Sequence, residues 1–196
     1  MKKLLFIMAM SVLFIFPVSA FAATGEGEEE FVSQANLLDE SLAGIEEIEA
    51  DITESNREIL GAITDRLKLK ITERSQLVGN VKATRTQVEQ LKENRVAILS
   101  EVTRIRSSQV EMSEEQLAAL IKGAKSTAVQ LKNSQYHVGQ VSKETVALVK
   151  HISQKDLLSI KKQVQAVIQV QNNRIILLEE LNSELEFLLS ILQEIH

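Results

Sequence analysis

Apolar residues recur in alternating steps of three and four along the stretch from Leu60 to Met112. One set of positions, each seven residues after the last, starts at Leu60, and a second set starts at Ile63. Eleven of the sixteen positions in these two sets are apolar. Such a repeat is typical of a long helix that buries one narrow face against another helix. The pattern therefore predicts one continuous helix through this stretch.

The same helical spacing continues upstream. The apolar face shifts by one position near Ile59, which predicts a change of packing partner there while the helix itself continues. The pair Gly79–Asn80 is typical of a helix end, but Leu77 and Val81 keep the same register on either side of it. We therefore expect one helix over about 36–110, and the alternative is a fourth helix created by a break at Gly79–Asn80.

Two capping patterns divide the rest of the chain. Ser113 and Gln116 have the spacing of a capping box, in which each side chain bonds to the backbone amide of the other residue. A weaker copy of the same pattern begins at Ser153. These patterns predict two further helices, over about 114–151 and 154–195.

The predicted fold class is all-α, an elongated antiparallel helical bundle or coiled coil of three long helices. The last helix has three apolar positions per heptad, so it should contact more than one neighbour. Two arrangements remain open. In one, the second and third helices pack on residues near 70–112 and leave the earlier part as an arm. In the other, they lie end to end along the whole first helix.

The first residues have the pattern of a secretory signal peptide. Two lysines precede the apolar run Leu4–Phe16, which is too short to span a bilayer, and the sequence Ala20–Ala22 fits a cleavage site. We expect a signal peptide over 1–22, a disordered acidic lead-in over 23–35, and a helical coiled-coil domain over 36–196. The expected location is secreted or extracytoplasmic, in a space of the cell-envelope or periplasm type, with no stable membrane span after cleavage.

The charge is unevenly distributed. Residues 23–60 carry twelve acidic side chains and one arginine, whereas residues 61–112 carry ten basic and six acidic side chains. A nucleic-acid-binding domain would show a basic face throughout, so we expect no nucleic-acid partner. The chain contains no cysteine, which excludes disulfide bonds.

No pattern in the sequence predicts catalysis or a cofactor. His137, Glu144 and His151 are seven residues apart, which is about 10.5 Å along a helix and too far for them to share one metal ion. Motifs for zinc proteases, phosphate-binding loops and serine hydrolases do not occur. We therefore expect no enzyme activity, no metal and no cofactor.

Two groups of residues are candidate functional positions. Polar residues that interrupt the predicted apolar faces should set helix register, and the alternative is that they recognise an anion. These are Arg74, Arg95, Gln171 and Arg174. The C-terminal helix is apolar on nearly all sides, which predicts a surface for self-association or a protein partner, and the alternative is that the bundle encloses it. Its candidate interface residues are Ile176, Leu177, Leu185, Phe187, Leu188, Ile191 and Leu192.

The function expected from these patterns is that of an exported structural or interaction protein: a scaffold, adaptor or assembly component that acts through helix–helix contacts. The alternative is an extracytoplasmic helical bundle that binds a small ligand or an ion, in the manner of a sensor module. In that case the loosely packed, alanine-lined middle helix and the core arginines would form the binding site.

Overall fold

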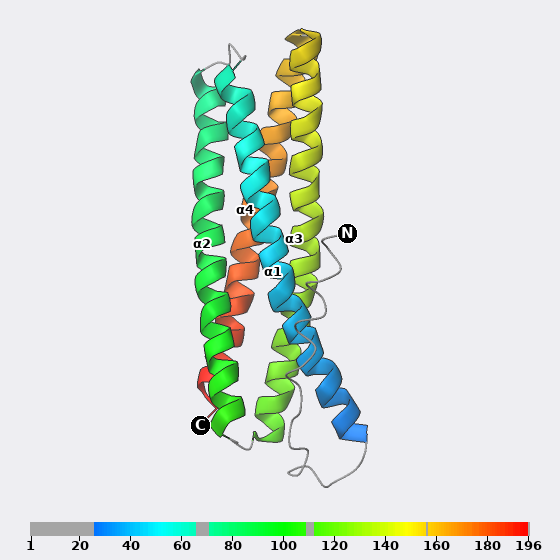
Figure 1. Ribbon diagram of the computed structural model, residues 1–196, viewed down its shortest axis with the longest axis vertical. Coiled ribbons are helices and arrows are strands. Elements are labelled where there is room, and N and C mark those ends of the chain that lie inside the picture. Colours follow the sequence, from blue (N-terminus) through cyan, green and yellow to red (C-terminus); the bar gives the residue numbers. More distant parts are fainter. Residues whose placement is uncertain (1–25, 66–70, 109–111, 156, 196) are drawn as a thin grey trace, which may run out of the picture. The chain divides into compact units, whose positions relative to one another are not determined.

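The computed structural model describes residues 26–65, 71–108, 112–155 and 157–195. The described residues form four α-helices and no strand, which confirms the predicted all-α bundle. In chain order the helices are α1 (Glu26–Asp65), α2 (Ile71–Ser108), α3 (Glu114–Gln154) and α4 (Leu157–Gln193) (Figure 1). Residues from Gln34 onward form one compact unit, which contains the bundle.

The first predicted helix is in fact two helices. α1 ends at Asp65 and α2 begins at Ile71, so the prediction of one helix over about 36–110 is wrong. The alternative break at Gly79–Asn80 is also wrong, because this pair lies inside α2. A seven-residue repeat cannot distinguish these cases, since a helix can end and a second can begin with the same phase.

α2 runs back beside α1 as an antiparallel partner. Arg95 of α2 pairs with Glu46 of α1. Lys92 lies three residues before Arg95, and its Nζ is 3.7 Å from Oε2 of Glu49, which lies three residues after Glu46. A step back along α2 thus matches a step forward along α1. Burial raises the pKa of the Glu49 carboxyl above its ordinary value, and the charges of Lys92 and Arg95 oppose that rise. These contacts place the acidic helix against the more basic one.

α4 packs against both α2 and α3. It runs in the same direction as α2, because Asn182 contacts Asn94 and the later Ile195 contacts Arg104. It runs opposite to α3, since Gln163 near its start bonds to Glu144 near the end of α3. Figure 1 shows α1 in front of α4, with α2 and α3 on either side.

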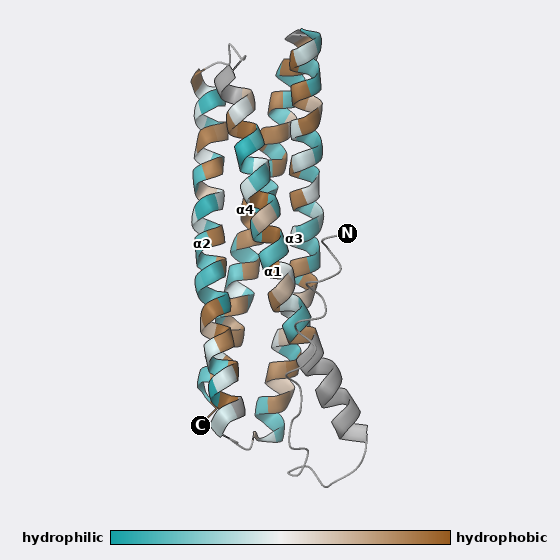
Figure 2. Cartoon of the chain, in the orientation of Figure 1, coloured by the Kyte–Doolittle hydropathy of each residue, from teal (hydrophilic) through white to brown (hydrophobic). Residues whose placement is uncertain are grey.

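The core is built from the apolar faces of all four helices, and apolar and polar residues alternate along each helix (Figure 2). α1 contributes a row of buried side chains, from Leu38 through Ile45, Ile48 and Ile52 to Ile59. The arrangement in which the upstream part forms a free arm is therefore wrong for these residues. Folding α1 back buries large isoleucines that an arm would expose to water.

The predicted boundary at Ser113 is confirmed. Ser113 Oγ accepts a hydrogen bond from the Gln116 amide at 3.2 Å, and the Ser113 amide donates to Gln116 Oε1 at 2.9 Å, which is a complete capping box. The second boundary is misplaced. Ser153 lies inside α3 and donates to the carbonyl of Lys150. The helix ends at Gln154, and its C-cap Lys155 is in the left-handed conformation with φ of 57°.

The expected start of the helical region also differs. α1 begins at Glu26, inside the segment 23–35 for which no structure was expected, so this acidic lead-in is helical from Glu26 onward. The predicted signal peptide over 1–22 lies outside the described residues.

Candidate functional site

A layer of buried polar side chains separates the apolar core into two clusters. Ile52 of α1 and Leu178 of α4 belong to one cluster. Ile59 of α1 and Ile168 of α4 belong to the other. Each polar side chain in the layer is at most 2% exposed. The layer consists of Ser55 and Asn56 from α1, Thr84 from α2, and Gln171 and Arg174 from α4. The predicted core positions of Gln171 and Arg174 therefore match the structure.

Arg174 is the centre of this layer. Its Nη2 atom donates to Asn56 Oδ1 at 2.8 Å and to Thr84 Oγ1 at 3.3 Å, and its Nη1 atom donates to Ser55 Oγ at 3.3 Å. All three acceptors are neutral, and no ion pair among the described residues involves Arg174. The guanidinium is 1% exposed. The core thus holds one positive charge that is solvated only by neutral oxygens.

Burial lowers the pKa of Arg174 from its ordinary value to about 10. The cause is desolvation, since a low-dielectric core disfavours the charged form of a base. The shift corresponds to a cost of about 3 kcal/mol for holding the charge in the folded protein. A buried residue that destabilises the fold by this amount is expected to have a structural or functional role. Here its contacts set the register of α4, because only one axial position of that helix brings Arg174 to both Asn56 and Thr84.

We expect stability to rise with pH at this site. The folded state has the lower pKa, so it releases the proton first. The destabilisation present at neutral pH is therefore lost as the pH rises above about 10, towards the higher ordinary pKa of the unfolded state. Urea unfolding of the wild type and of Arg174→Met at increasing alkaline pH measures this directly. As the pH increases, the unfolding free energy of the wild type should rise relative to that of Arg174→Met. A difference that stays constant with pH would contradict the assignment.

A second polar contact fixes α2 against α4. Asn94 Nδ2 donates to Asn182 Oδ1 at 3.2 Å, and Asn182 Nδ2 donates to the side-chain and backbone oxygens of Gln87. Both asparagines are buried. Because buried amides lose free energy when unpaired, this contact adds to the register set by Arg174.

The other two predicted core arginines do not lie in the core. Arg74 is exposed, and the buried residue is its neighbour Glu73. Arg95 is partly buried at the edge of the bundle, where it pairs with Glu46, and the inward polar residue is its neighbour Asn94. In both places the inward position is one residue earlier than predicted. Most other positions of the same count in α2 are buried, so the difference is local: the buried positions of this helix follow steps of three and four that do not repeat strictly every seven residues.

Most of the predicted C-terminal interface is core. Leu185, Leu188 and Leu192 are at most 1% exposed, and Ile191 is 8% exposed. Leu177 is partly buried. Only Ile176 and Phe187 remain as exposed apolar side chains, at 53% and 52%. The prediction of a broad apolar surface on this helix is wrong, because three neighbouring helices cover α4.

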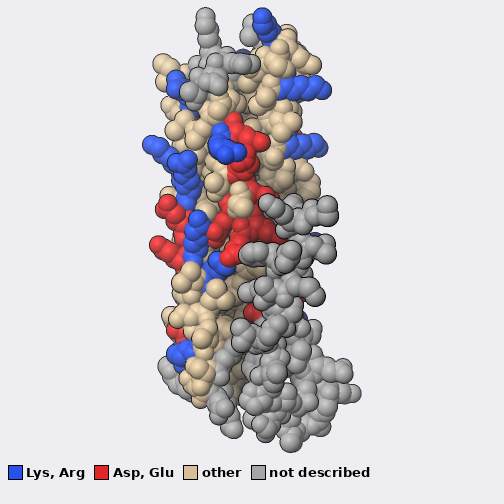
Figure 3. All heavy atoms as spheres, in the orientation of Figure 1, with Lys and Arg blue, Asp and Glu red and all other residues tan. Residues whose placement is uncertain are grey.

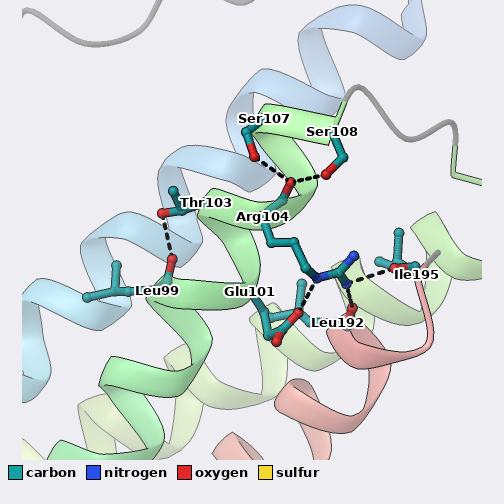
Figure 4. A network of polar contacts seen from close by, with 8 residues as sticks. All are labelled: Leu99, Glu101, Thr103, Arg104, Ser107, Ser108, Leu192 and Ile195. Atoms are coloured by element: carbon teal, nitrogen blue, oxygen red, sulfur yellow. Dashed lines mark hydrogen bonds and ion pairs between the residues drawn. The ribbon is translucent and has the colours of Figure 1, made fainter.

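The C-terminal end of α4 is held by side chains from other helices (Figure 4). Arg104 of α2 donates from Nη2 to the carbonyl oxygens of Leu192 at 3.2 Å and Ile195 at 2.8 Å, while its Nε donates to Glu101 at 2.7 Å. Gln116 of α3 donates to the carbonyl of Glu194 at 3.3 Å. These groups satisfy carbonyls that the end of a helix leaves unpaired, and the positive charge suits the negative end of the helix dipole.

Replacing Arg104 with methionine should destabilise the bundle by about 1–2 kcal/mol, since two charge-assisted hydrogen bonds to the end of α4 are lost. Urea unfolding gives the free energy, and hydrogen exchange should show faster opening of the last turn of α4. The exposed Arg85 on the same helix is the matched control. If Arg85→Met and Arg104→Met have equal effects, the contact at the end of α4 contributes nothing specific.

On the outer surface, a groove of about 350 Å³ runs between α1 and α3. Glu40 and Glu47 line it from α1, and Ala128 and Gln135 line it from α3. Gly44 marks the close approach of the two helices, because a Cβ atom there would lie 2.6 Å from Leu131 Cδ2. α1 and α3 run in the same direction, so residues on the two walls lie side by side over several turns (Figure 1).

Residues of opposite charge lie on the two helices that form the groove, and of these Glu40 and Glu47 line it. On α1 the acidic row is Glu40, Glu47 and Glu58, and on α3 the basic row is Lys125, Lys132 and Lys143. Figure 3 shows acidic side chains gathered on the face that α1 presents, and basic side chains at the upper right, beside the last turns of α3. No ion pair among the described residues joins the two rows.

Sequence reasoning missed several of these residues. Ser55 and Asn56 could have been found, because they interrupt the row of isoleucines between Ile52 and Ile59 at an inward position. The acidic and basic rows were visible only as net charge, since their position beside one groove depends on which helices are neighbours.

The described residues contain no cluster of histidine, cysteine and acidic side chains that could hold a metal ion. Among the same residues, no helix combines the length and the apolar character needed to cross a membrane. Comparison with protein-family models, with curated proteins and with solved structures found no match.

Proposed function

We propose that this chain is an exported, non-enzymatic interaction protein, a scaffold, adaptor or assembly component, that binds a protein partner through the outer surface of α1 and α3. The observation that carries the proposal is the pair of oppositely charged rows beside the α1–α3 groove. Glu40, Glu47, Lys125 and Lys132 are exposed, and no ion pair among the described residues joins the rows. Charged groups arranged in this way steer a complementary partner and set its orientation.

The composition of the surface supports a protein partner. An acidic row would repel the phosphates of a nucleic acid, whereas a protein can present both signs of charge at once. The sequence features that support export are the apolar run Leu4–Phe16 and the cleavage pattern Ala20–Ala22. The proposed surface lies on α1 and α3 because α4 buries most of the residues first expected to form it.

Site-specific photo-cross-linking in the exporting cell tests this function. A photoreactive amino acid at position 47 or 132 should give adducts with protein. The same amino acid at the exposed Ser183 on α4 should give none. If positions 47 and 132 give no more adduct than position 183, the proposed surface does not bind protein.

A second candidate function, binding of a small anion in the core, is favoured by the unpaired positive charge of Arg174. Two donors of the polar layer, Arg174 Nε and Gln171 Nε2, have no hydrogen-bond partner among the described residues. An anion that binds there would stabilise the folded state. The test is the melting temperature in chloride and in gluconate, which should differ for the wild type and not for Arg174→Met.

A further inference from the structure

The two charged rows beside the groove have the same spacing. The acidic residues Glu40, Glu47 and Glu58 follow one another at steps of seven and eleven, and so do the basic residues Lys125, Lys132 and Lys143. Steps of seven and eleven are close to two and three helical turns, so each row keeps to one side of its helix. Each lysine is 85 positions after the corresponding glutamate.

The structure places the two rows level with each other. Gly44 of α1 lies against Leu131 of α3, which is an offset of 87 positions in helices that run the same way. This differs from the offset of the rows by two residues, or about 3 Å along the helix. Each glutamate therefore lies at about the height of its lysine on the neighbouring helix. Glu40 and Glu47 line the groove between the helices, and the lysines lie outside its lining.

A two-fold axis parallel to the helices would bring the rows of two molecules together. Such an axis turns the α1–α3 surface of one copy to face that of the other, keeps every residue at its own height, and places α1 opposite the α3 of the partner. The acidic row of each copy then meets the basic row of the other, so the same pairing occurs twice, once on each side of the axis. An axis perpendicular to the helices within the same surface would place α1 against α1, so acid would face acid.

Apolar groups lie on the same face of α3. Val146 and Val149 are 58% and 48% exposed. Val146 is eighteen residues, or five turns, after Ala128, and Val149 is eighteen residues after Leu131, so both continue the side that lines the groove. Two helices side by side over about 40 Å offer roughly 800 Å² per molecule, which is the size of a standard interface.

We propose that the partner on the α1–α3 surface is a second copy of this chain, in a parallel, two-fold symmetric dimer in which α1 of each copy packs on α3 of the other. The proposal rests on the proposed function and names the partner of the same surface. The dimer should weaken as salt increases, because partly exposed ion pairs are screened.

Two charge-reversed chains test the arrangement. One carries Glu40→Lys and Glu47→Lys, so that both helices of its surface are basic. The other carries Lys125→Glu and Lys132→Glu, so that both are acidic. Each chain alone should have a dimer dissociation constant at least about 100-fold above that of the wild type, because attractive contacts become repulsive. An equimolar mixture of the two chains should form heterodimers with near wild-type affinity.

Sedimentation equilibrium across the micromolar range measures these states, and far-ultraviolet circular dichroism checks that each chain is folded. The control chain carries Glu179→Lys and Glu180→Lys on the exposed side of α4 and should dimerise as the wild type does. A wild-type chain that stays monomeric overturns the proposal, and so does a mixture that fails to form heterodimers. If the wild type is monomeric while position 47 still cross-links to another protein, the interaction function holds and the partner is not a second copy.

Discussion

Replacing Asn56 with leucine should lower the free energy of unfolding by about 3 kcal/mol, because Arg174 then keeps its buried charge and loses its shortest hydrogen bond. In a chain that already carries Arg174→Met, the same replacement should have the opposite sign. Methionine removes the charge and leaves the Asn56 amide unpaired in the core, so leucine at position 56 then removes an unsatisfied polar group. The double variant should be about 1–4 kcal/mol more stable than the wild type.

Urea unfolding of the wild type, the two single variants and the double variant completes the thermodynamic cycle. The exposed Asn133 on α3 provides the control, and Asn133→Leu should change stability by less than about 0.5 kcal/mol. If the effects of the two replacements simply add, Asn56 and Arg174 are not coupled, and the polar layer is not a unit.

Truncating Leu185 to alanine should destabilise the bundle by about 3–4 kcal/mol, whereas Phe187→Ala on the same turn of α4 should cost less than about 1 kcal/mol. Leu185 is fully buried and Phe187 is 52% exposed. Truncating the larger side chain therefore has the smaller effect. The loss of unfolding free energy depends on the apolar area removed from the core and on the cavity that remains.

Thermal and urea unfolding of the two variants, together with their oligomeric state, distinguish core from surface on α4. If Leu185→Ala leaves stability unchanged but alters association, then α4 would be an interface, as first expected. Equal losses of stability in both variants would mean that Phe187 packs more tightly than its exposure indicates.

The features of the fold that depend on local chemistry were predictable from the sequence. The capping box at Ser113 involves residues three positions apart, so it is complete before any helix packs on another. The buried positions of Gln171 and Arg174 follow from the phase of α4 alone. The helix class follows from the repeat of apolar residues and from the rarity of proline and glycine.

The features that depend on chain direction were not predictable. A heptad repeat records which residues face a partner but not whether the chain turns back, so α1 and α2 looked like one helix. That error made α1 an arm. It also left α4 with too few neighbours, which made its core leucines look like an exposed surface.

The arrangement of α1 beside α2 and α3 underlies both the polar layer and the proposed interaction surface, because Asn56 reaches Arg174, and Glu47 reaches the groove, only if α1 folds back. The most direct test is a distance between spin labels on Ala50 of α1 and Glu89 of α2, both exposed, in a chain that has no native cysteine and is diluted with unlabelled protein. The hairpin predicts a separation below about 30 Å, from two adjacent helices plus the label linkers. A single continuous helix would separate the two positions by about 58 Å, and that result would contradict the bundle described above.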